Sequence, residues 1–108
     1  MNRWQTIKQR ILKRDKNTCQ RCGQRSLNVY HRVPRCEITR DELHYGPDNL
    51  ITLCKDCHEY VKTHRAYGHR AGFSVQSWYP PELMPVDTIA GQVRLLRNGR
   101  VMETGGSS

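Results

Sequence analysis

The chain has 108 residues, of which 36% are hydrophobic and 7% aromatic, and its formal net charge at pH 7 is +8. A chain of this length forms one small domain, which often needs a metal ion or disulfide bonds to remain folded. No apolar run is long enough to form a membrane-spanning helix. The basic excess favours nucleic acid or another polyanion as a partner, although charge alone also fits a basic surface that serves solubility.

The first predicted element is an amphipathic helix that begins after a cap at Asn2 and ends near Arg14. Trp4, Ile7 and Ile11 recur at helical spacing and therefore share one face, with basic residues elsewhere on the helix. We expect this apolar face to pack into the core rather than to bind a partner.

Two short strands and a second helix follow. Residues 26–33 alternate apolar and polar side chains, which is typical of a half-buried strand. Residues 35–47 are predicted to form a polar loop, and residues 50–53 a second strand. Residues 55–67 are predicted to form a helix that Gly68 stops.

A β-hairpin is predicted near the C-terminus, at residues 92–104. Asn98-Gly99 is the strongest short sequence pattern for a hairpin turn. A two-residue turn at this point would place Leu96 opposite Val101.

The predicted elements divide the chain into two parts. Residues 1–70, which contain both predicted strands and four of the five cysteines, are expected to form the core. Residues 71–108 are expected to form an extended C-terminal arm that contains the hairpin and ends in a flexible tail, Gly-Gly-Ser-Ser. The predicted fold class is small α+β.

Four of the five cysteines form two Cys-x-x-Cys pairs, Cys19 with Cys22 and Cys54 with Cys57. Two such pairs offer four thiolates to a tetrahedral structural zinc ion. Because no apolar leader precedes them, we expect a reducing, cytoplasmic location, where such pairs bind metal rather than form disulfides. A redox protein with reactive thiols is the alternative. Cys36 has no such partner and is interpreted as an unpaired thiol.

Two histidines in this frame suit the hydrolysis of a phosphodiester. That reaction needs a general base to deprotonate water and a divalent cation to offset charge on the phosphate. His31 titrates near neutrality and suits the first task. His58, held rigidly after Cys57 at the start of a helix, suits the second. The plainer alternatives are a half-exposed histidine without a chemical role at 31, and a helix cap or a zinc ligand at 58.

These segments closely resemble the HNH endonuclease family, which acts on DNA. The resemblance is carried by Cys-Gln-Arg-Cys-Gly at 19–23, Val-Tyr-His-Arg-Val-Pro-Arg at 29–35 and Asp-Asn-Leu-Ile-Thr-Leu-Cys-Lys-Asp-Cys-His at 48–58. It implies that residues 1–70 are an HNH nuclease core with two zinc knuckles, in a zinc-stapled ββα-metal fold whose four paired cysteines hold structural zinc. It further implies that His31 is the general base, that Asn49 orients it, and that His58 ligates a catalytic Mg²⁺, Mn²⁺ or other divalent metal. Asn49 is also an ordinary turn residue.

Two departures from the family's pattern concern the catalytic metal. Tyr30 stands where an Asp or His usually ligates the metal, and a neutral phenol is a poor ligand. Lys62 stands where many members have a second histidine, and His64 lies about 120° around a regular helix from His58, which makes it a weak ligand candidate. The remaining alternatives are loss of the metal or recruitment of another acid from Glu37, Asp48 and Glu59.

Basic residues near the histidines are predicted to contact the DNA backbone: Arg32, Arg35, Lys62 and Arg65. Such contacts are largely independent of sequence, so an endonuclease of weak sequence specificity is expected. The alternative is a non-catalytic zinc-containing DNA-binding module of HNH ancestry, which Tyr30 and Lys62 favour. RNA is a less favoured substrate because the sequence has no recognisable aromatic stacking platform.

The C-terminal arm also resembles HNH proteins of actinobacteria and their phages, through residues 72–75 and 84–86. For a phage protein this implies the host-cell cytoplasm and work beside a DNA-packaging terminase. The sequence contains no recognisable dimer interface.

Overall fold

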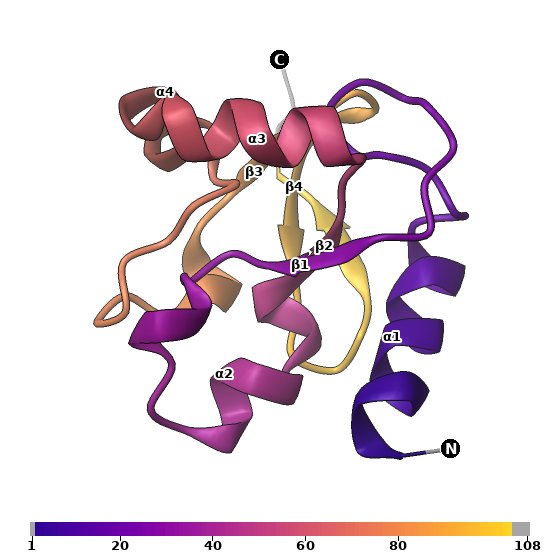
Figure 1. Ribbon diagram of the computed structural model, residues 1–108, viewed down its shortest axis with the longest axis vertical. Helices are drawn as coiled ribbons and strands as arrows, with labels where there is room; N and C mark the ends of the chain where they lie inside the picture. The colour runs from indigo at the N-terminus through magenta and orange to yellow at the C-terminus, as the bar shows by residue number, and fades with distance from the viewer. Residues whose placement is uncertain (1, 105–108) are drawn as a thin grey trace.

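A computed structural model describes residues 2–104 as a small α+β protein (Figure 1), which confirms the predicted fold class. In this range, four α-helices and three short 3-10 helices accompany two small antiparallel sheets. The tail predicted at residues 105–108 lies outside the described residues. Within residues 2–104, no helix is both long and apolar enough to cross a membrane.

The N-terminal helix α1 (Arg3–Arg14) forms where the sequence predicts it. The Asn2 side chain accepts a hydrogen bond from the Gln5 backbone N–H at 2.8 Å, and the Gln5 side chain accepts one from the Asn2 N–H at 3.3 Å. This reciprocal capping box stabilises the start of the helix. Ile7 and Ile11 are buried, so the apolar face packs into the core as expected.

The central antiparallel sheet consists of β1 (Val29–His31) and β2 (Leu50–Thr52). β1 is shorter than the strand predicted at residues 26–33. Leu27 is 50% exposed, and the Ser26 hydroxyl donates to a backbone carbonyl beyond the end of β2. The alternating pattern at the start of this segment therefore does not correspond to sheet pairing.

Two ion-paired residues at the end of α1, Arg14 and Asp15, join the helix to the sheet through hydrogen bonds. The Arg14 Nε lies 2.8 Å from an Asp15 carboxylate oxygen, and both side chains are almost completely buried. The Arg14 guanidinium also donates to the carbonyls of Pro47 and Leu50, while Asp15 accepts from the Thr52 N–H. Charge-assisted hydrogen bonds of this kind are strong, so they fix α1 against β2.

The segment predicted as a polar loop, residues 35–47, is largely helical, and this prediction is wrong. Leu43 is buried with Val33 and Val75, which gives the segment its own small apolar cluster. One buried leucine in a short helix produces no sequence periodicity, which explains the missed helix. The elements here are η1 (Arg35–Glu37), α2 (Asp41–Tyr45) and η2 (Pro47–Asn49).

The helix predicted at residues 55–67 is two helices, α3 (Lys55–Thr63) and α4 (Arg65–Ala71). Gly68 does not stop the helix but lies inside α4. A Cβ at this position would lie 3.0 Å from a Val61 methyl group, so the glycine permits close packing between the two helices.

The C-terminal arm folds into η3 (Pro81–Leu83) and a three-stranded sheet of β3 (Val86–Thr88), β4 (Gly91–Leu95) and β5 (Val101–Glu103). The predicted hairpin at residues 92–104 is confirmed, and β3 is an additional strand. Leu95, not Leu96, lies opposite Val101. The loop is one residue longer than predicted and ends with Gly99 at φ +90°, which is typical of a three-residue hairpin loop.

The arm shares a hydrophobic core with the rest of the chain. Phe73, Val86 and Leu95 are buried in one cluster with Ile51 of β2 and Val61 of α3. In Figure 1 the arm's sheet accordingly lies behind β1 and β2.

Arg32 connects β1 to the arm and is 1% exposed. Its guanidinium donates hydrogen bonds of 2.7 to 3.0 Å to the carbonyls of Asp48, Gly72, Pro81 and Met84. A buried guanidinium with these partners cannot contact DNA, which corrects the prediction made for Arg32. Its role in the fold is to hold four separate carbonyls together.

Candidate metal centre and histidine site

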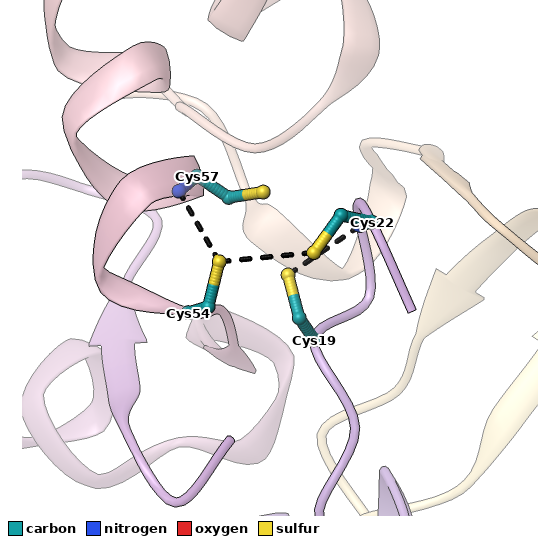
Figure 2. Close-up of side chains that lie close together, drawn as sticks. All are labelled: Cys19, Cys22, Cys54 and Cys57. Atoms are coloured by element: carbon teal, nitrogen blue, oxygen red, sulfur yellow. Dashed lines mark hydrogen bonds between the residues drawn. The ribbon is translucent and has the colours of Figure 1, made fainter. Parts of the chain in front are cut away.

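The four paired cysteines come together as a metal-binding group. Their sulfur atoms all lie within 4.8 Å of one another, and the Cys22 and Cys54 sulfurs are 3.7 Å apart. Zn–S bonds of about 2.3 Å at tetrahedral angles place sulfurs about 3.8 Å apart. Figure 2 shows the four side chains converging from the first knuckle loop and the start of α3. The arrangement therefore fits a tetrahedral zinc ion.

Local backbone geometry aims these thiols at one another. Cys54 is the N-cap of α3, and its sulfur accepts a hydrogen bond from the Cys57 N–H at 3.4 Å. The Cys19 sulfur accepts from the Cys22 N–H at 3.5 Å, and Gly23 at φ +86° closes that turn. Backbone N–H groups directed at sulfur favour the thiolate form that binds metal.

The pKa values of two of these thiols, Cys57 and Cys19, are shifted in opposite directions. Burial raises the pKa of the Cys57 thiol to about 12. Burial also acts to raise the pKa of Cys19, but backbone hydrogen bonds outweigh it and lower that pKa to about 7. Four thiolates so close together need a cation, which a divalent metal supplies.

Arg21 provides additional positive charge beside the cysteines. Its guanidinium lies over the Tyr60 ring at 3.9 Å and donates to the Tyr67 hydroxyl at 2.9 Å. A second guanidinium nitrogen is 3.5 Å from the Cys57 sulfur. The sequence marks Arg21 only as one basic residue among many, because both tyrosines come from distant segments.

His31, at the end of β1, lies in a cluster of three stacked rings. Its ring centroid is 5.4 Å from that of Trp4 and 5.0 Å from that of His44. Its Nε2 is 3.0 Å from the His44 backbone oxygen. A carbonyl only accepts hydrogen bonds, so Nε2 carries the proton and Nδ1 has the free lone pair. Burial lowers the pKa of His31, which favours the neutral ring.

Asn49 is completely buried and bridges two neighbouring segments. Its side-chain oxygen accepts from the Val33 N–H at 2.9 Å, and its amide nitrogen donates to the Leu43 carbonyl at 2.7 Å. One of these partners follows β1, and the other directly precedes His44, whose carbonyl holds His31. Asn49 therefore joins the two segments that set the position of the His31 ring.

His58 lies in the first turn of α3 and stacks on Tyr30. The two ring centroids are 3.7 Å apart, and burial lowers the pKa of His58. Among residues 2–104 the four cysteines are the only group of three or more His, Cys, Asp or Glu side chains placed to hold a metal. His58 is thus not part of a preformed cluster of such ligands.

His64 lies between α3 and α4 and contacts the last turn of α3. Its Nδ1 is 2.9 Å from the Tyr60 carbonyl oxygen, and its ring stacks on the Tyr60 ring. The remaining predicted DNA contacts, Arg35, Lys62 and Arg65, are all exposed.

Trp4 and His44 are the site residues that sequence reasoning missed. The helical spacing predicts only a core position for Trp4, and His44 lies in the segment predicted to be a loop. Neither is near His31 in the sequence, so no local pattern connects them.

Comparison with known proteins supports the same family. Residues 19–63 match the family model described as HNH endonuclease. The probable HNH endonuclease of Lactococcus phage SK1 is 37% identical to this chain over 60 residues, which are 51% of this chain and 64% of that protein. The chain thus spans less than two thirds of that relative. No solved structure matches significantly. Residues 19–63, which carry both cysteine pairs and the histidines between and beside them, are an HNH endonuclease domain.

Proposed function

We propose that this protein is a divalent-metal-dependent endonuclease that hydrolyses DNA phosphodiester bonds, with His31 as its general base. The observation that carries the proposal is the hydrogen bond from His31 Nε2 to the His44 carbonyl. It leaves Nδ1 free to accept a proton from water. The match of residues 19–63 to the HNH endonuclease family supports the reaction class.

In the proposed step, His31 Nδ1 takes one proton from a water molecule while the water oxygen forms a bond to phosphorus. The bond between phosphorus and the leaving oxygen breaks, and that oxygen takes a proton from solvent. The imidazolium then returns its proton to solvent. Because burial lowers the pKa of His31, the ring starts the step in its neutral form. Asn49 acts as a positioning residue, since it bonds to the segments on either side of this site.

We assign the catalytic metal to His58 and a structural zinc ion to the four cysteines. A divalent ion held by His58 would supply positive charge to offset the charge on the phosphate and the leaving oxygen. His58 would hold it together with ligands from outside the protein, as is usual where protein ligands are few. Imidazole suits Ni²⁺ or Zn²⁺ better than Mg²⁺ or Mn²⁺.

Exposed basic residues would hold the DNA near the site. The side chains of Arg35, Lys62 and Arg65 are all accessible. The one ion pair that Lys62 makes among residues 2–104, with Glu59 at 4.0 Å, is long and exposed, so it leaves Lys62 able to contact a phosphate. Contacts to phosphates do not read bases, so cleavage with weak sequence specificity is proposed.

A setting in a phage-infected cell is part of the proposal. The relative named above comes from a phage, which supports the host cytoplasm as the location. The proposed partner there is a packaging terminase. Co-purification of the two proteins would support this partnership, and independent elution at micromolar concentrations would contradict it.

The second candidate function is a zinc-containing DNA-binding module that does not hydrolyse DNA. Tyr30 favours it, because this residue occupies the face of His58 and supplies no carboxylate or imidazole to a metal.

Conversion of supercoiled plasmid to nicked or linear DNA, with Mg²⁺, Mn²⁺, Ni²⁺ or Zn²⁺ added singly, separates the two functions. We expect metal-dependent cutting that is lost in His31→Ala and retained in His64→Ala, the matched histidine control. Binding without cutting in any of these ions would favour the second function. Recovery of cutting in Tyr30→His would then identify the missing ligand as the cause.

A further inference from the structure

A basic groove of about 950 Å³ separates α1 from the loop between β4 and β5. Figure 1 shows this yellow loop beside the indigo helix. Most of the lining residues lie outside residues 19–63, the part that matches the HNH family. No Asp or Glu lines the groove, whereas five of its residues are cationic: Arg3, Arg10, Lys13, Arg14 and Arg97.

Some of the cationic side chains in the groove already have ion-pair or hydrogen-bond partners within the protein, and others do not. Arg14 is buried and bonded to Asp15 and to backbone carbonyls, so it serves the fold. Arg10 and Lys13 are exposed and have no ion-pair partner among residues 2–104. Arg97, from the opposite wall, is 59% exposed and 3.7 Å from Asp48. Arg3 is likewise exposed and lies 3.5 Å from Asp41. Arg10 and Lys13 therefore supply the positive charge in the groove that no acidic side chain among residues 2–104 pairs with.

The length of the cationic wall suits a polymer better than a single small anion. Arg3 and Lys13 are ten residues apart on one helix, which corresponds to about 15 Å. Successive phosphates of one DNA strand advance about 3.4 Å along the duplex axis, so this wall spans roughly four of them. Its charge is thus distributed on the scale of a nucleic acid backbone.

One end of the groove adjoins the histidine site. Tyr45 lines the groove, and the Arg3 guanidinium lies over its ring at 4.1 Å. The same ring meets the His44 ring edge-on at 4.4 Å, and the His44 carbonyl holds His31. A strand lying in the groove would therefore continue toward His31.

We infer that the groove between α1 and the β4–β5 loop binds the phosphate backbone of the DNA segment adjoining the cleaved bond. This inference rests on the proposed DNA-directed function. It assigns affinity to α1 and to the hairpin, in addition to the basic residues beside the histidines.

The test is DNA affinity as a function of salt, measured by fluorescence anisotropy on a labelled 20-base-pair duplex. All variants carry His31→Ala, so that the duplex is not cut. The groove variant is Arg10→Gln with Lys13→Gln, since glutamine preserves helix propensity. The control is Arg25→Gln with Arg70→Gln, which removes the same charge at two exposed positions that do not line the groove. Zinc content and circular dichroism confirm that each variant is folded.

We expect the groove variant to reduce the slope of log K against log salt by about 1.8, since each lost phosphate contact removes about 0.9. The control should change it far less. Equal slopes in the groove variant and its parent would overturn the inference, as would a parent that does not bind DNA. Plasmid cleavage by the His31-containing protein is scored separately. If plasmid is cut but the groove variant binds DNA as its parent does, the nuclease proposal stands and the groove inference is rejected. If binding depends on the groove but no plasmid is cut, the groove inference stands and the nuclease proposal is rejected.

Discussion

The ring of Tyr30 lies flat against the ring of His58, with the centroids 3.7 Å apart and the planes 8° apart. A stacked ring covers the face of an imidazole but does not occupy the plane of its nitrogens, so His58 can still bind a metal. Tyr30 itself adds no good ligand, because a neutral phenol binds divalent ions weakly. Under the proposed function, this pair of residues would therefore limit how tightly a metal ion binds at His58.

Replacing Tyr30 with histidine is expected to strengthen metal binding at His58. The new imidazole would supply a second nitrogen ligand, and we expect the affinity for Ni²⁺ to rise by about tenfold or more. Titration calorimetry on protein already loaded with one zinc ion measures this. Tyr30→Phe keeps a stacked ring without a ligand and should behave as the parent does. Equal affinities in all three proteins would mean that His58 is not the metal site.

The pH dependence of cleavage should follow the titration of His31. Burial lowers its pKa below the usual 6.5, against the hydrogen bond to the His44 carbonyl, which acts to raise it. A general base works in its neutral form, so activity is complete above this pKa and falls as the pH drops through it. The acidic limb of kcat/KM should therefore lie below pH 6.5.

Trp4→Leu should move that limb to higher pH, because the smaller side chain uncovers the His31 ring and relieves its desolvation. Trp78→Leu is the matched control, since Trp78 is 74% exposed. A limb that stays in place, or that moves to lower pH, would show that Trp4 does not set the environment of the base.

Arg32→Met is expected to destabilise the protein by about 3 kcal/mol or more, because it leaves several buried carbonyls without donors. Urea unfolding in the presence of zinc measures this change. Arg35→Met removes a charge of the same kind at an exposed position and should shift the free energy of unfolding by less than about 0.5 kcal/mol. Arg32→Lys should be intermediate at best, since an ammonium lacks the planar fork that serves separate carbonyls. Unchanged stability in Arg32→Met would contradict the assigned role.

Zinc removal should abolish cooperative unfolding, since a chain of this size depends on its metal staple.

Arg21→Gln should make the zinc easier to remove, because it takes a cation away from the Cys57 sulfur. The rate of zinc transfer to a chromogenic chelator measures this, with Arg25→Gln as the control that removes an exposed arginine. A transfer rate equal to that of the parent would exclude charge support by Arg21.

Features set by nearby residues were predictable from the sequence. The capped helix from Asn2 to Arg14 was predicted correctly because its cap and apolar spacing are local. The two Cys-x-x-Cys pairs indicated one metal site because each pair places two ligands a turn apart. The hairpin at residues 92–104 was also predictable, but its register was not, because the choice between a two- and a three-residue loop depends on how β4 packs.

Features set by contacts between distant segments were not predictable in this way. The local motifs carried the resemblance to the HNH family, and with it the predicted zinc ligands and the candidate base, because the residues of each motif are close together in the sequence. That Arg32 is buried while Arg35, three residues later, is exposed became visible only in the fold. The same holds for the stacking of Trp4 and His44 on His31. Burial and hydrogen-bond partners come from elements far along the chain, and a spacing pattern contains no information about them.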